Sequence, residues 1–407
     1  MTKDIKISVT LDGKPWRAAA QRDGVETFVL DVSDGAVTCE VRYDYDDAPL
    51  CLNAKAAAGD RVEIVLMAHR IELRVNGRVE DEEWPAGSRL FAGCGLSGAP
   101  AQLRMESYVE PEESQADVLG VFTGAEGWQP EENVFVGDCM PYVKDGEYHV
   151  LYLKDRHHHR SKWGLGAHQW EHISTRDFAK WTIPPMAVPI TDPSEASICT
   201  GSWIRRGKME YLFYTVRRGK GVAAPIRRSV SQDGYRFKKD ESFSFELSDK
   251  YVAWKARDPK VILGEDGQYH LFITTRLSSD GRGCIAHYVS SDLDCWRDAG
   301  EPIYVADDEA EPECPDYIHY AGRYYLIFSL HARAQYLISD RPFDGWRAPK
   351  EPAIPCGKVP KGAIWGERIV FTGFQAAQGC YGGTMTFKAA VADEDGELAF
   401  MPLSDAH

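Results

Sequence analysis

The sequence predicts an all-β protein in which a five-bladed β-propeller follows an antiparallel β-sandwich. Three observations lead to this prediction. Aromatic residues, which favour strands, are abundant, with 11 Trp, 19 Tyr and 16 Phe. Short runs of alternating apolar and polar residues fill the N-terminal part, and a glycine-led run of aromatic and β-branched residues recurs along the rest. No stretch carries the helical spacing that the crossover helices of a parallel sheet would require.

Charge and cysteine content disfavour several classes of protein. The formal net charge of −15 at pH 7 disfavours binding to nucleic acids and to anionic membranes, because both present phosphate groups. The 10 cysteines show neither disulfide-framework spacing nor a Cys-x-x-Cys pair, so we expect reduced thiols. The first residues show no signal-peptide pattern, and no apolar run approaches the length of a membrane span. We therefore expect a cytoplasmic protein.

Residues 1–112 are predicted to form the sandwich. Apolar and polar residues alternate in Arg70–Val75, and Asn76-Gly77, the sequence of a tight hairpin turn, follows directly. The sandwich is either a carbohydrate-binding module or a structural module. The structural interpretation is favoured, because the strand pattern is generic. The acidic, turn-rich residues 113–132 are predicted to connect the sandwich to the propeller at 133–407.

A repeat defines the second domain. Each unit starts with a glycine and continues as a strand-like run, and the first four units end with a Ser/Asp segment that closes on an aromatic residue. The runs begin at Gly146, Gly207, Gly267, Gly322 and, more weakly, Gly366. The interval between units accommodates about four antiparallel strands, which is the size of a propeller blade. Neighbouring blades cover both faces of each sheet, which explains why the runs are almost continuously apolar.

A polar residue precedes the strand-like run in each of the first four units at nearly the same interval. These residues are Asp138, Ser202, Asp258 and Glu313. The first strand of every blade lines the central channel of a propeller, so equivalent positions on different blades approach one axis. The sequence therefore predicts that the carboxylates of Asp138, Asp258 and Glu313 meet at one mouth of the channel.

Converging carboxylates indicate the cleavage of a glycosidic bond. Crowded carboxylates repel one another, so at least one keeps its proton at neutral pH and acts as an acid that faces an ionised partner. Glycoside hydrolysis requires such a pair. Arg257 is expected to keep the neighbouring Asp258 ionised. The indole rings of Trp163, Trp170 and Trp254 are either platforms for a sugar ring or part of the blade core, and core is favoured for each ring taken singly.

The run Arg156–Arg160 contains three consecutive histidines. Side chains alternate in direction along an extended chain, so these histidines cannot all face one metal ion. A polar loop at the channel mouth is the favoured interpretation, and His158 is predicted to contact substrate there. Cysteines near the same mouth (Cys139, Cys199 and Cys314) lack a catalytic cysteine motif, so we expect buried small side chains. No metal and no organic cofactor is expected.

These motifs resemble glycoside hydrolase family 32, the group of fructofuranosidases, invertases and levanases. Over about residues 133–346 the matches occur in the family's order, at Trp170-Glu171-His172, Cys199-Thr200-Gly201-Ser202, Arg257-Asp258-Pro259 and Glu313-Cys314-Pro315-Asp316. The resemblance implies that Glu313 is the acid/base and that Asp258 contacts sugar hydroxyls and stabilises the transition state. The predicted substrate-binding residues are Arg257, Ser202, Trp170, Trp163, His158 and Trp254.

Two departures accompany the resemblance. The nucleophile motif of the family is Trp-x-Asn-Asp-Pro-Asn-Gly, whereas Val136–Tyr142 keeps only the aspartate, Asp138. Asp138 is thus the inferred nucleophile, and the absence of the sugar-contacting asparagines indicates a different furanoside or linkage. In the family the sandwich follows the propeller, whereas here the predicted sandwich precedes it.

The sequence therefore predicts a retaining glycoside hydrolase that cleaves a fructofuranoside-like bond in a carbohydrate substrate. Retention predicts carboxyl groups of Asp138 and Glu313 about 5–5.5 Å apart. Two alternatives stay open. The related propeller family 43, of arabinofuranosidases and xylosidases, uses three channel carboxylates and inverts the anomeric centre. A sugar-binding propeller without turnover is favoured by the broken motif around Asp138 and disfavoured by Glu313, because a lectin needs no proton donor. The sequence does not indicate an oligomeric state.

Overall fold

The computed structural model describes residues 4–44, 48–85, 87–111, 118–156, 168–195, 197–217, 221–376 and 380–403. These residues divide into two compact units. The first unit holds residues 4–111 and 190–195, and the second holds 118–156, 168–189 and 197–403. Both units are built from antiparallel strands, which confirms the predicted all-β class. No helix in the described part of the chain has the length and apolar character of a membrane span.

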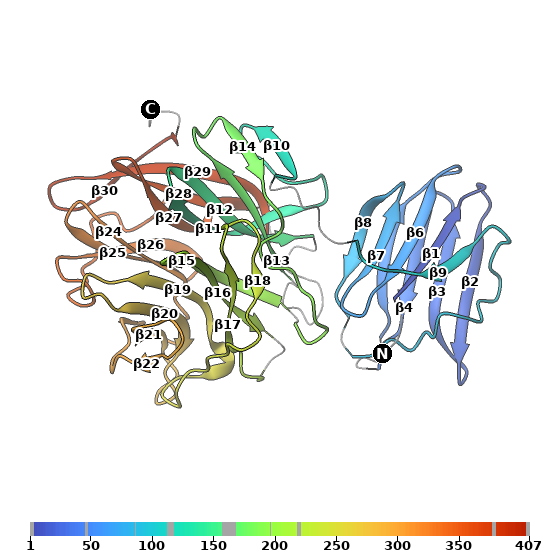
Figure 1. Cartoon of the computed structure of the whole chain (residues 1–407), viewed down its shortest axis with the longest axis horizontal. Helices are drawn as coiled ribbons and strands as arrows, with labels where there is room; N and C mark the ends of the chain where they lie inside the picture. Colours follow the sequence, from blue (N-terminus) through green and yellow to red (C-terminus); the bar gives the residue numbers. More distant parts are fainter. Residues whose placement is uncertain are drawn as a thin grey trace. The chain divides into compact units, whose positions relative to one another are not determined.

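The first unit consists of two antiparallel sheets, drawn in blue and cyan in Figure 1. One sheet has the strand order β8-β7-β6-β1-β9 and the other the order β2-β3-β4-β5. The strands are β1 (Ile5–Thr10), β2 (Trp16–Arg22), β3 (Val25–Ser33), β4 (Ala36–Val41), β5 (Leu50–Lys55), β6 (Arg61–Leu66), β7 (Ile71–Val75), β8 (Arg78–Glu83) and β9 (Arg104–Ser107). Apolar side chains from both sheets, among them Ile7, Leu30 and Ile64, form one core. This is the arrangement of a β-sandwich.

The hairpin predicted at Asn76-Gly77 is present. Strand β7 pairs with β8 up to Val75 and Arg78, and the two turn residues have φ angles of 52° and 86°. A turn of this kind needs positive φ at both central positions, which Asn and Gly adopt at low cost. Ile71 and Leu73 on β7 lie in the shared core, as the alternating pattern predicts.

The second unit is built from consecutive antiparallel meanders (Figure 1). The first is β11 (Phe135–Lys144), β12 (Glu147–Asp155), β13 (Gln169–Thr175) and β14 (Lys180–Ile183). The second is β15 (Ser197–Arg206), β16 (Met209–Arg217), β17 (Ile226–Ser231) and β18 (Lys238–Lys239). The third is β19 (Arg257–Leu263), β20 (Tyr269–Arg276), β21 (Gly283–Ser290) and β22 (Arg297–Asp298), with β23 (Tyr304–Val305) also paired to β21.

The fourth meander is β24 (Glu313–Tyr320), β25 (Arg323–Leu330) and β26 (Arg333–Ser339). The fifth is β27 (Lys358–Trp365), β28 (Arg368–Ala376), β29 (Gly383–Ala392) and β30 (Leu398–Met401). Strand β10 (Gly120–Thr123) adds to the edge of the first meander by pairing with β14, and a short 3₁₀ turn, η2 (Ala253–Lys255), precedes β19. In every meander the recurrent glycine turns the first strand into the second. The φ angles of Gly146, Gly207, Gly267, Gly322 and Gly366 are 72°, 61°, 75°, 73° and 59°.

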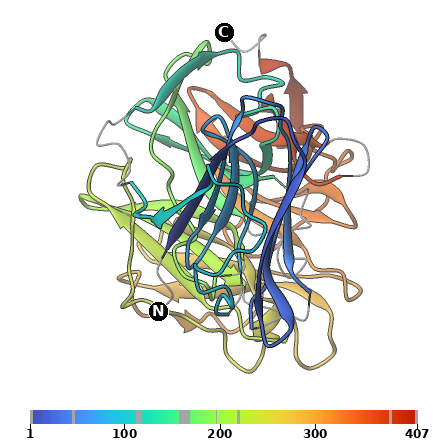
Figure 2. The ribbon, with the colours of Figure 1, turned by 90° about the vertical axis from the view of Figure 1, so that its right-hand side faces the viewer.

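The first strands of the meanders pack side by side. Strand β11 contacts β15, β15 contacts β19, β19 contacts β24, β24 contacts β27, and β27 contacts β11. Figure 2 shows the meanders following one another around a common centre, from green through yellow and orange to red. Among the described residues, backbone hydrogen bonds do not join the meanders into one closed sheet. The first and fifth meanders share a sheet through the pair Val136 and Gly383, and the other three form separate sheets.

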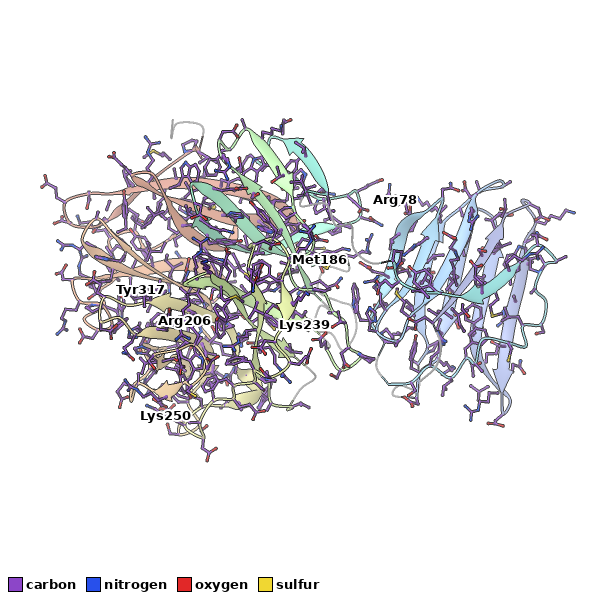
Figure 3. All side chains as sticks on the ribbon, in the orientation of Figure 1. Arg78, Met186, Arg206, Lys239, Lys250 and Tyr317 are labelled. Atoms are coloured by element: carbon purple, nitrogen blue, oxygen red, sulfur yellow. The ribbon has the colours of Figure 1, made fainter. Side chains whose placement is uncertain are left out.

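Side chains fill the space between the strands within each unit (Figure 3). Tyr317 on β24, labelled in Figure 3, packs with Phe272 of the third meander, with ring centroids 5.3 Å apart, and with Phe343 of its own meander. Large aromatic side chains such as Trp181 and Tyr148 are fully buried. The abundance of aromatic residues in the sequence thus serves mainly to fill the cores between meanders.

Candidate active site

The first strand of every meander carries a β-bulge at the same place. The pairing register shifts between Val136 and Cys139, Ile198 and Gly201, Arg257 and Lys260, Glu313 and Asp316, and Lys358 and Lys361. A bulge inserts unpaired residues and changes the direction of their side chains. Asp138 and Asp258 are both bulge residues. Because the first strands pack around a common centre, their bulges bring side chains of different meanders together.

Backbone strain marks the same position. Asp258, Cys314 and Val359 directly follow the last paired residue before their bulges, and they have φ angles of 57°, 52° and 38°. This left-handed region is unfavourable for residues with a Cβ atom. In Asp258-Pro259, Cys314-Pro315 and Val359-Pro360 a proline follows. Strained backbone of this kind is concentrated at functional sites in proteins, where the surrounding structure holds it in place.

Asp138 on β11 accepts hydrogen bonds at both carboxylate oxygens. The hydroxyl of Thr200 donates to Oδ2 at 2.7 Å, and the hydroxyl of Tyr381 donates to Oδ1 at 2.8 Å. The thiol of Cys314 lies 3.3 Å from Oδ2. Asp138 is 9% exposed. These donors come from the second, fifth and fourth meanders, so the position of this carboxylate depends on the packing of four meanders.

Asp258 on β19 lies beside Asp138 and is more deeply buried, at 4% exposure. Its Oδ2 accepts the backbone N–H of Cys314 at 3.0 Å, and the thiol of Cys314 lies 3.6 Å from the same oxygen. The Cys314 thiol is thus within reach of both aspartates. Burial raises the pKa of Asp258 to about 6, and the charge of Asp138 adds to this rise.

Arg257 is the neighbour that we expect to keep Asp258 ionised, and its Nε atom lies 3.6 Å from Asp258 Oδ2. Its attraction lowers the pKa of Asp258, but the cost of burying the charge is larger. The hydrogen bonds of the Arg257 guanidinium also go elsewhere, to Glu311 at 2.6 Å and to Glu313 at 2.8 Å.

Glu313 stands at the start of β24 and differs from the two aspartates in its exposure. Its side chain is 50% exposed, and Arg257 holds one of its oxygens. The three predicted carboxylates are therefore brought together through shared partners. Cys314 joins Asp138 to Asp258, and Arg257 joins Asp258 to Glu313. Two of these carboxylates are buried and the third is half exposed, so the three groups lie in different environments.

A buried cation lies behind the aspartates. Lys361 on β27 is 2% exposed and donates to the carbonyl of Gly201 at 3.1 Å. Burial lowers the pKa of Lys361, while the charges of Asp316 and Asp258 oppose that change. Asp316 is itself paired with Lys260 at 2.5 Å. The inner strands thus carry alternating charges that compensate one another below the site.

Two predicted substrate-binding residues are buried and hydrogen-bonded to other parts of the protein. Ser202 is 4% exposed, and its hydroxyl donates to the carbonyl of Pro259 at 3.0 Å and accepts the N–H of Val261 at 2.9 Å. The Ser202 hydroxyl thus joins β15 to β19, and the side chain is buried. Trp170 is fully buried, and its Nε1 donates to the carbonyl of Cys199 at 3.0 Å. It belongs to the core, the alternative favoured for a single tryptophan.

The remaining predicted residues divide into two groups. Trp254 lies on η2 with the ammonium of Lys255 4.5 Å from its ring centroid, and it is only partly buried. A ring placed beside Arg257 in the chain is compatible with a sugar platform. Trp163 and His158 lie outside the described residues.

Thr200 and Tyr381 are the residues that the sequence pattern did not single out. Thr200 occupies the bulge position that corresponds to Asp138, whereas the spacing rule selected Ser202, two residues later. On three strands, the proline of an Asp-Pro, Cys-Pro or Val-Pro pair stands at the bulge position equivalent to Asp138 and Thr200. These prolines are the sequence signal that indicates where the strands bulge. Tyr381 precedes β29 in a segment with no motif. The absence of a side chain at Gly137 makes room for it, because a Cβ there would lie 2.6 Å from the tyrosine hydroxyl.

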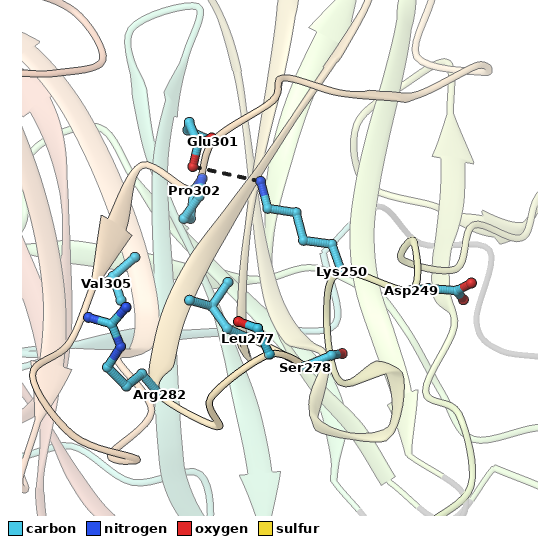
Figure 4. Close-up of a pocket in the computed structure, with 9 residues that line it drawn as sticks. Asp249, Lys250, Leu277, Ser278, Arg282, Glu301, Pro302 and Val305 are labelled. Carbon is cyan, nitrogen blue, oxygen red and sulfur yellow. Dashed lines mark ion pairs between the residues drawn. The ribbon is translucent and has the colours of Figure 1, made fainter.

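Among the described residues, no group of three or more His, Cys, Asp or Glu side chains would suit a metal ion. A pocket of about 500 Å³ lies on the third meander, lined by Asp249, Lys250, Leu277, Arg282 and Glu301 among others. Figure 4 shows this pocket with the ion pair of Lys250 and Glu301, 3.8 Å apart. It contains none of the predicted carboxylates.

Comparison with known families identifies the motifs. Residues 125–345 match the family model described as the glycosyl hydrolases family 32 N-terminal domain. The match spans all three predicted carboxylates.

Curated relatives agree with this match. The cell wall isozyme of β-fructofuranosidase from Pisum sativum is 23% identical over 200 residues, which cover 47% of this chain and 35% of that protein. The levanbiose-producing levanase of Bacillus subtilis (strain 168) is 25% identical over 210 residues, which cover 48% of this chain and 36% of that protein. The chain therefore matches little more than a third of the length of these relatives.

Solved structures show the same fold. Fructan 1-exohydrolase IIa from Cichorium intybus, in complex with 1-kestose, superposes with a TM-score of 0.58 at 18% identity. The superposition covers 70% of this chain and 61% of that chain. At this level of identity the similarity concerns the fold alone.

Proposed function

Because the chain belongs to glycosyl hydrolase family 32, we propose that it is a retaining hydrolase of fructofuranosidic bonds. The curated relatives are named as a fructofuranosidase and a levanase. The substrate class is a carbohydrate with a furanoside ring. The observation that carries the proposal is the grouping of Asp138, Asp258 and Glu313 through Cys314 and Arg257, with two carboxylates buried and one exposed.

We propose that the second unit is a five-bladed β-propeller. The ring of contacts among β11, β15, β19, β24 and β27 supports this proposal, because inner strands of neighbouring blades pack in this way around the axis of a propeller. The shared bulge of the five inner strands supports it independently. The first and fifth blades hydrogen-bond to each other, which is a means of closing a propeller ring.

In the proposed first step an oxygen of Asp138 attacks the anomeric carbon of the furanoside. The bond from this carbon to the departing oxygen breaks, and Glu313 transfers its proton to that oxygen. A glycosyl–Asp138 ester and a free alcohol result. The hydrogen bonds from Thr200 and Tyr381 hold Asp138 in one orientation for this attack. Positioning of a reacting group in this way lowers the entropic part of the barrier.

In the second step the ionised Glu313 takes a proton from water. The resulting hydroxide attacks the anomeric carbon, the ester bond to Asp138 breaks, and the sugar leaves with its original anomeric configuration. Glu313 is accessible to solvent, which this step requires. Asp258 is proposed to hold ring hydroxyls, and its negative charge stabilises the positive charge that develops on the sugar ring. Trp254, Trp163 and His158 remain proposed contacts of the substrate.

The proposal is tested with Glu313→Gln and Asp138→Asn, assayed by release of reducing sugar from sucrose, 1-kestose and levan. Each variant should lose at least about a hundredfold in kcat. The surface variant Asp280→Asn, which removes one partner of the exposed Asp280–Arg282 pair, serves as a matched control and should keep wild-type turnover. Near wild-type activity of Glu313→Gln would contradict the assignment.

Two alternatives are separated from this proposal by one further measurement each. An inverting enzyme of the family 43 type would release the opposite anomer, which NMR of the first-formed product detects. A sugar-binding propeller without turnover would show calorimetric binding of the same sugars with no release of product.

A further inference from the structure

Arg257 lies between two glutamates that have different environments. One nitrogen, Nη1, donates to Glu311 Oε2 at 2.6 Å, and the other, Nη2, donates to Glu313 Oε1 at 2.8 Å. The side chain of Glu311 is 9% exposed, whereas that of Glu313 is 50% exposed. The proposed function gives Glu313 the role of acid/base and assigns none to Glu311.

Glu311 is the centre of a cluster of cations. Besides Arg257, it pairs with Arg276 at 2.5 Å and with Lys255 at 2.9 Å. Burial would raise the pKa of Glu311, but Arg257 and Lys255 outweigh it and lower the pKa to about 2. Glu311 is therefore ionised at every pH at which a glycosidase works, so it has no proton to give. Glu311 therefore contributes a negative charge that does not change with pH over this range.

We propose that Glu311 is a positioning residue that anchors Arg257 and offsets its charge, so that Arg257 engages Glu313 through one nitrogen only. This inference rests on the proposed function, because it assigns Glu311 a role in the acid/base chemistry of Glu313. Without Glu311 the guanidinium is free to place both nitrogens on Glu313, which is the bidentate geometry that arginine prefers with carboxylates. A cation held in that way favours the ionised carboxylate.

The other charges around Arg257 fix the sign of the effect. Asp258 lies 3.6 Å from its Nε, Lys255 and Arg276 pair with Glu311, and Glu309 pairs with Arg276 at 2.9 Å. The charge of Asp138 raises the pKa of Asp258, and the charge of Lys361 lowers it. Replacing Glu311 by a neutral residue leaves the charges of Lys255, Arg257 and Arg276 less compensated. All three cations then favour loss of the proton from Glu313.

The test compares Glu311→Gln with Glu309→Gln in the full-length protein. We measure kcat/KM for the best furanoside across pH 4 to 9, together with thermal unfolding. Glu311→Gln should move the alkaline limb of the profile about one unit toward lower pH, because the acid is lost earlier. Glu309 is 81% exposed and contacts the outer side of Arg276. Its variant removes an equal charge from a partner of Arg276, whereas Glu311 bonds directly to the Arg257 that holds Glu313, and it should leave the limb in place.

A merely structural role for Glu311 would lower the melting temperature or reduce kcat/KM by one factor at all pH values. An alkaline limb that coincides with that of the wild type, or one that moves equally in Glu309→Gln, would overturn the inference. If Glu311→Gln does not fold, Glu311→Asp takes its place. This variant keeps the charge but withdraws it from Arg257, so a smaller shift in the same direction is expected, and an unchanged limb overturns the inference.

Failure of the proposed function has a different signature. In that case the wild type releases no sugar, or Glu313→Gln retains turnover, whatever the Glu311 variants do. An active wild type whose turnover depends on Glu313 but whose alkaline limb ignores Glu311 leaves the proposed function intact and removes only the role of Glu311.

Discussion

The hydroxyl of Tyr381 donates to Asp138 Oδ1 at 2.8 Å and also accepts the backbone N–H of Asp138 at 3.1 Å. One side chain thus fixes both the carboxylate and the backbone of the proposed nucleophile. The ring of Tyr381 stacks on that of His168, with centroids 5.2 Å apart. Tyr381 belongs to the fifth meander and Asp138 to the first, so this contact lies where the two ends of the second unit meet.

Tyr381→Phe should reduce kcat by about ten- to a hundredfold. A hydrogen bond to a charged group contributes about 1.5–3 kcal/mol, and RT ln 10 is about 1.4 kcal/mol. KM should change less than kcat, because the bond orients the nucleophile rather than the sugar. Steady-state kinetics on sucrose or levan measures both constants. An equal change in KM with an unchanged kcat would contradict this role.

Asp258→Asn should abolish activity and stabilise the protein at neutral pH. The folded-state pKa of Asp258 is raised to about 6, above an ordinary value of about 3.9. The folded state therefore holds this proton more tightly than the unfolded state, so the contribution of Asp258 to stability falls as pH rises from about 4 to 6. Asparagine keeps an oxygen for the N–H of Cys314 without the charge.

The difference in unfolding free energy between Asp258→Asn and the wild type should therefore grow with pH over this window. It should reach about 2–3 kcal/mol at pH 7. Urea unfolding of both proteins at pH 4, 5, 6 and 7 measures it. A difference that does not depend on pH would show that the carboxyl titrates normally.

Ser202→Ala should destabilise the protein without affecting substrate binding. The variant leaves the buried carbonyl of Pro259 and the N–H of Val261 without their partner, which costs about 1–3 kcal/mol. Thermal and chemical unfolding measure the loss. KM for the furanoside should stay within about twofold of the wild type, and a large rise in KM at unchanged stability would return Ser202 to the substrate site.

Cys314 should resist alkylation although it lies at the centre of the site. Burial raises the pKa of its thiol, and the charges of Asp138 and Asp258 raise it further. The thiolate is the reactive form, so the exposed residues Cys94 and Cys295 should react first with iodoacetamide at pH 7.5. Peptide mapping by mass spectrometry gives the order of labelling. Labelling of Cys314 as fast as Cys295 in the native protein would contradict its burial.

The repeat made the all-β class and the grouping of the carboxylates predictable. The glycine turns and apolar runs place Asp138, Asp258 and Glu313 on the first strands, and the structure connects these residues through shared partners. The pattern could not reveal where each strand bulges. One bulge changes which residues face the centre, so counting from the strand tyrosines selected Ser202 instead of Thr200.

The sequence pattern also could not predict contacts made by segments that carry no motif. Tyr381 reaches Asp138 from a loop, and its place depends on Gly137 having no side chain. Trp170 matched a family segment but lies in the core, since an indole ring fills a core as well as it covers a sugar. The raised pKa of Asp258 is due mainly to burial of its carboxyl group. Burial follows from the packing of several meanders, which no short motif encodes.

The tie between Tyr381 and Asp138 has a consequence for biosynthesis. The proposed nucleophile is made early and its last hydrogen-bond donor is made late, 243 residues further along the chain. A nascent polypeptide on the ribosome, or a fragment cut short before the fifth meander, lacks that donor and the strands that carry it. Catalytic competence should therefore arise only after the segment that carries Tyr381 has been synthesised, and termination before that segment should yield proteins without a correctly held nucleophile.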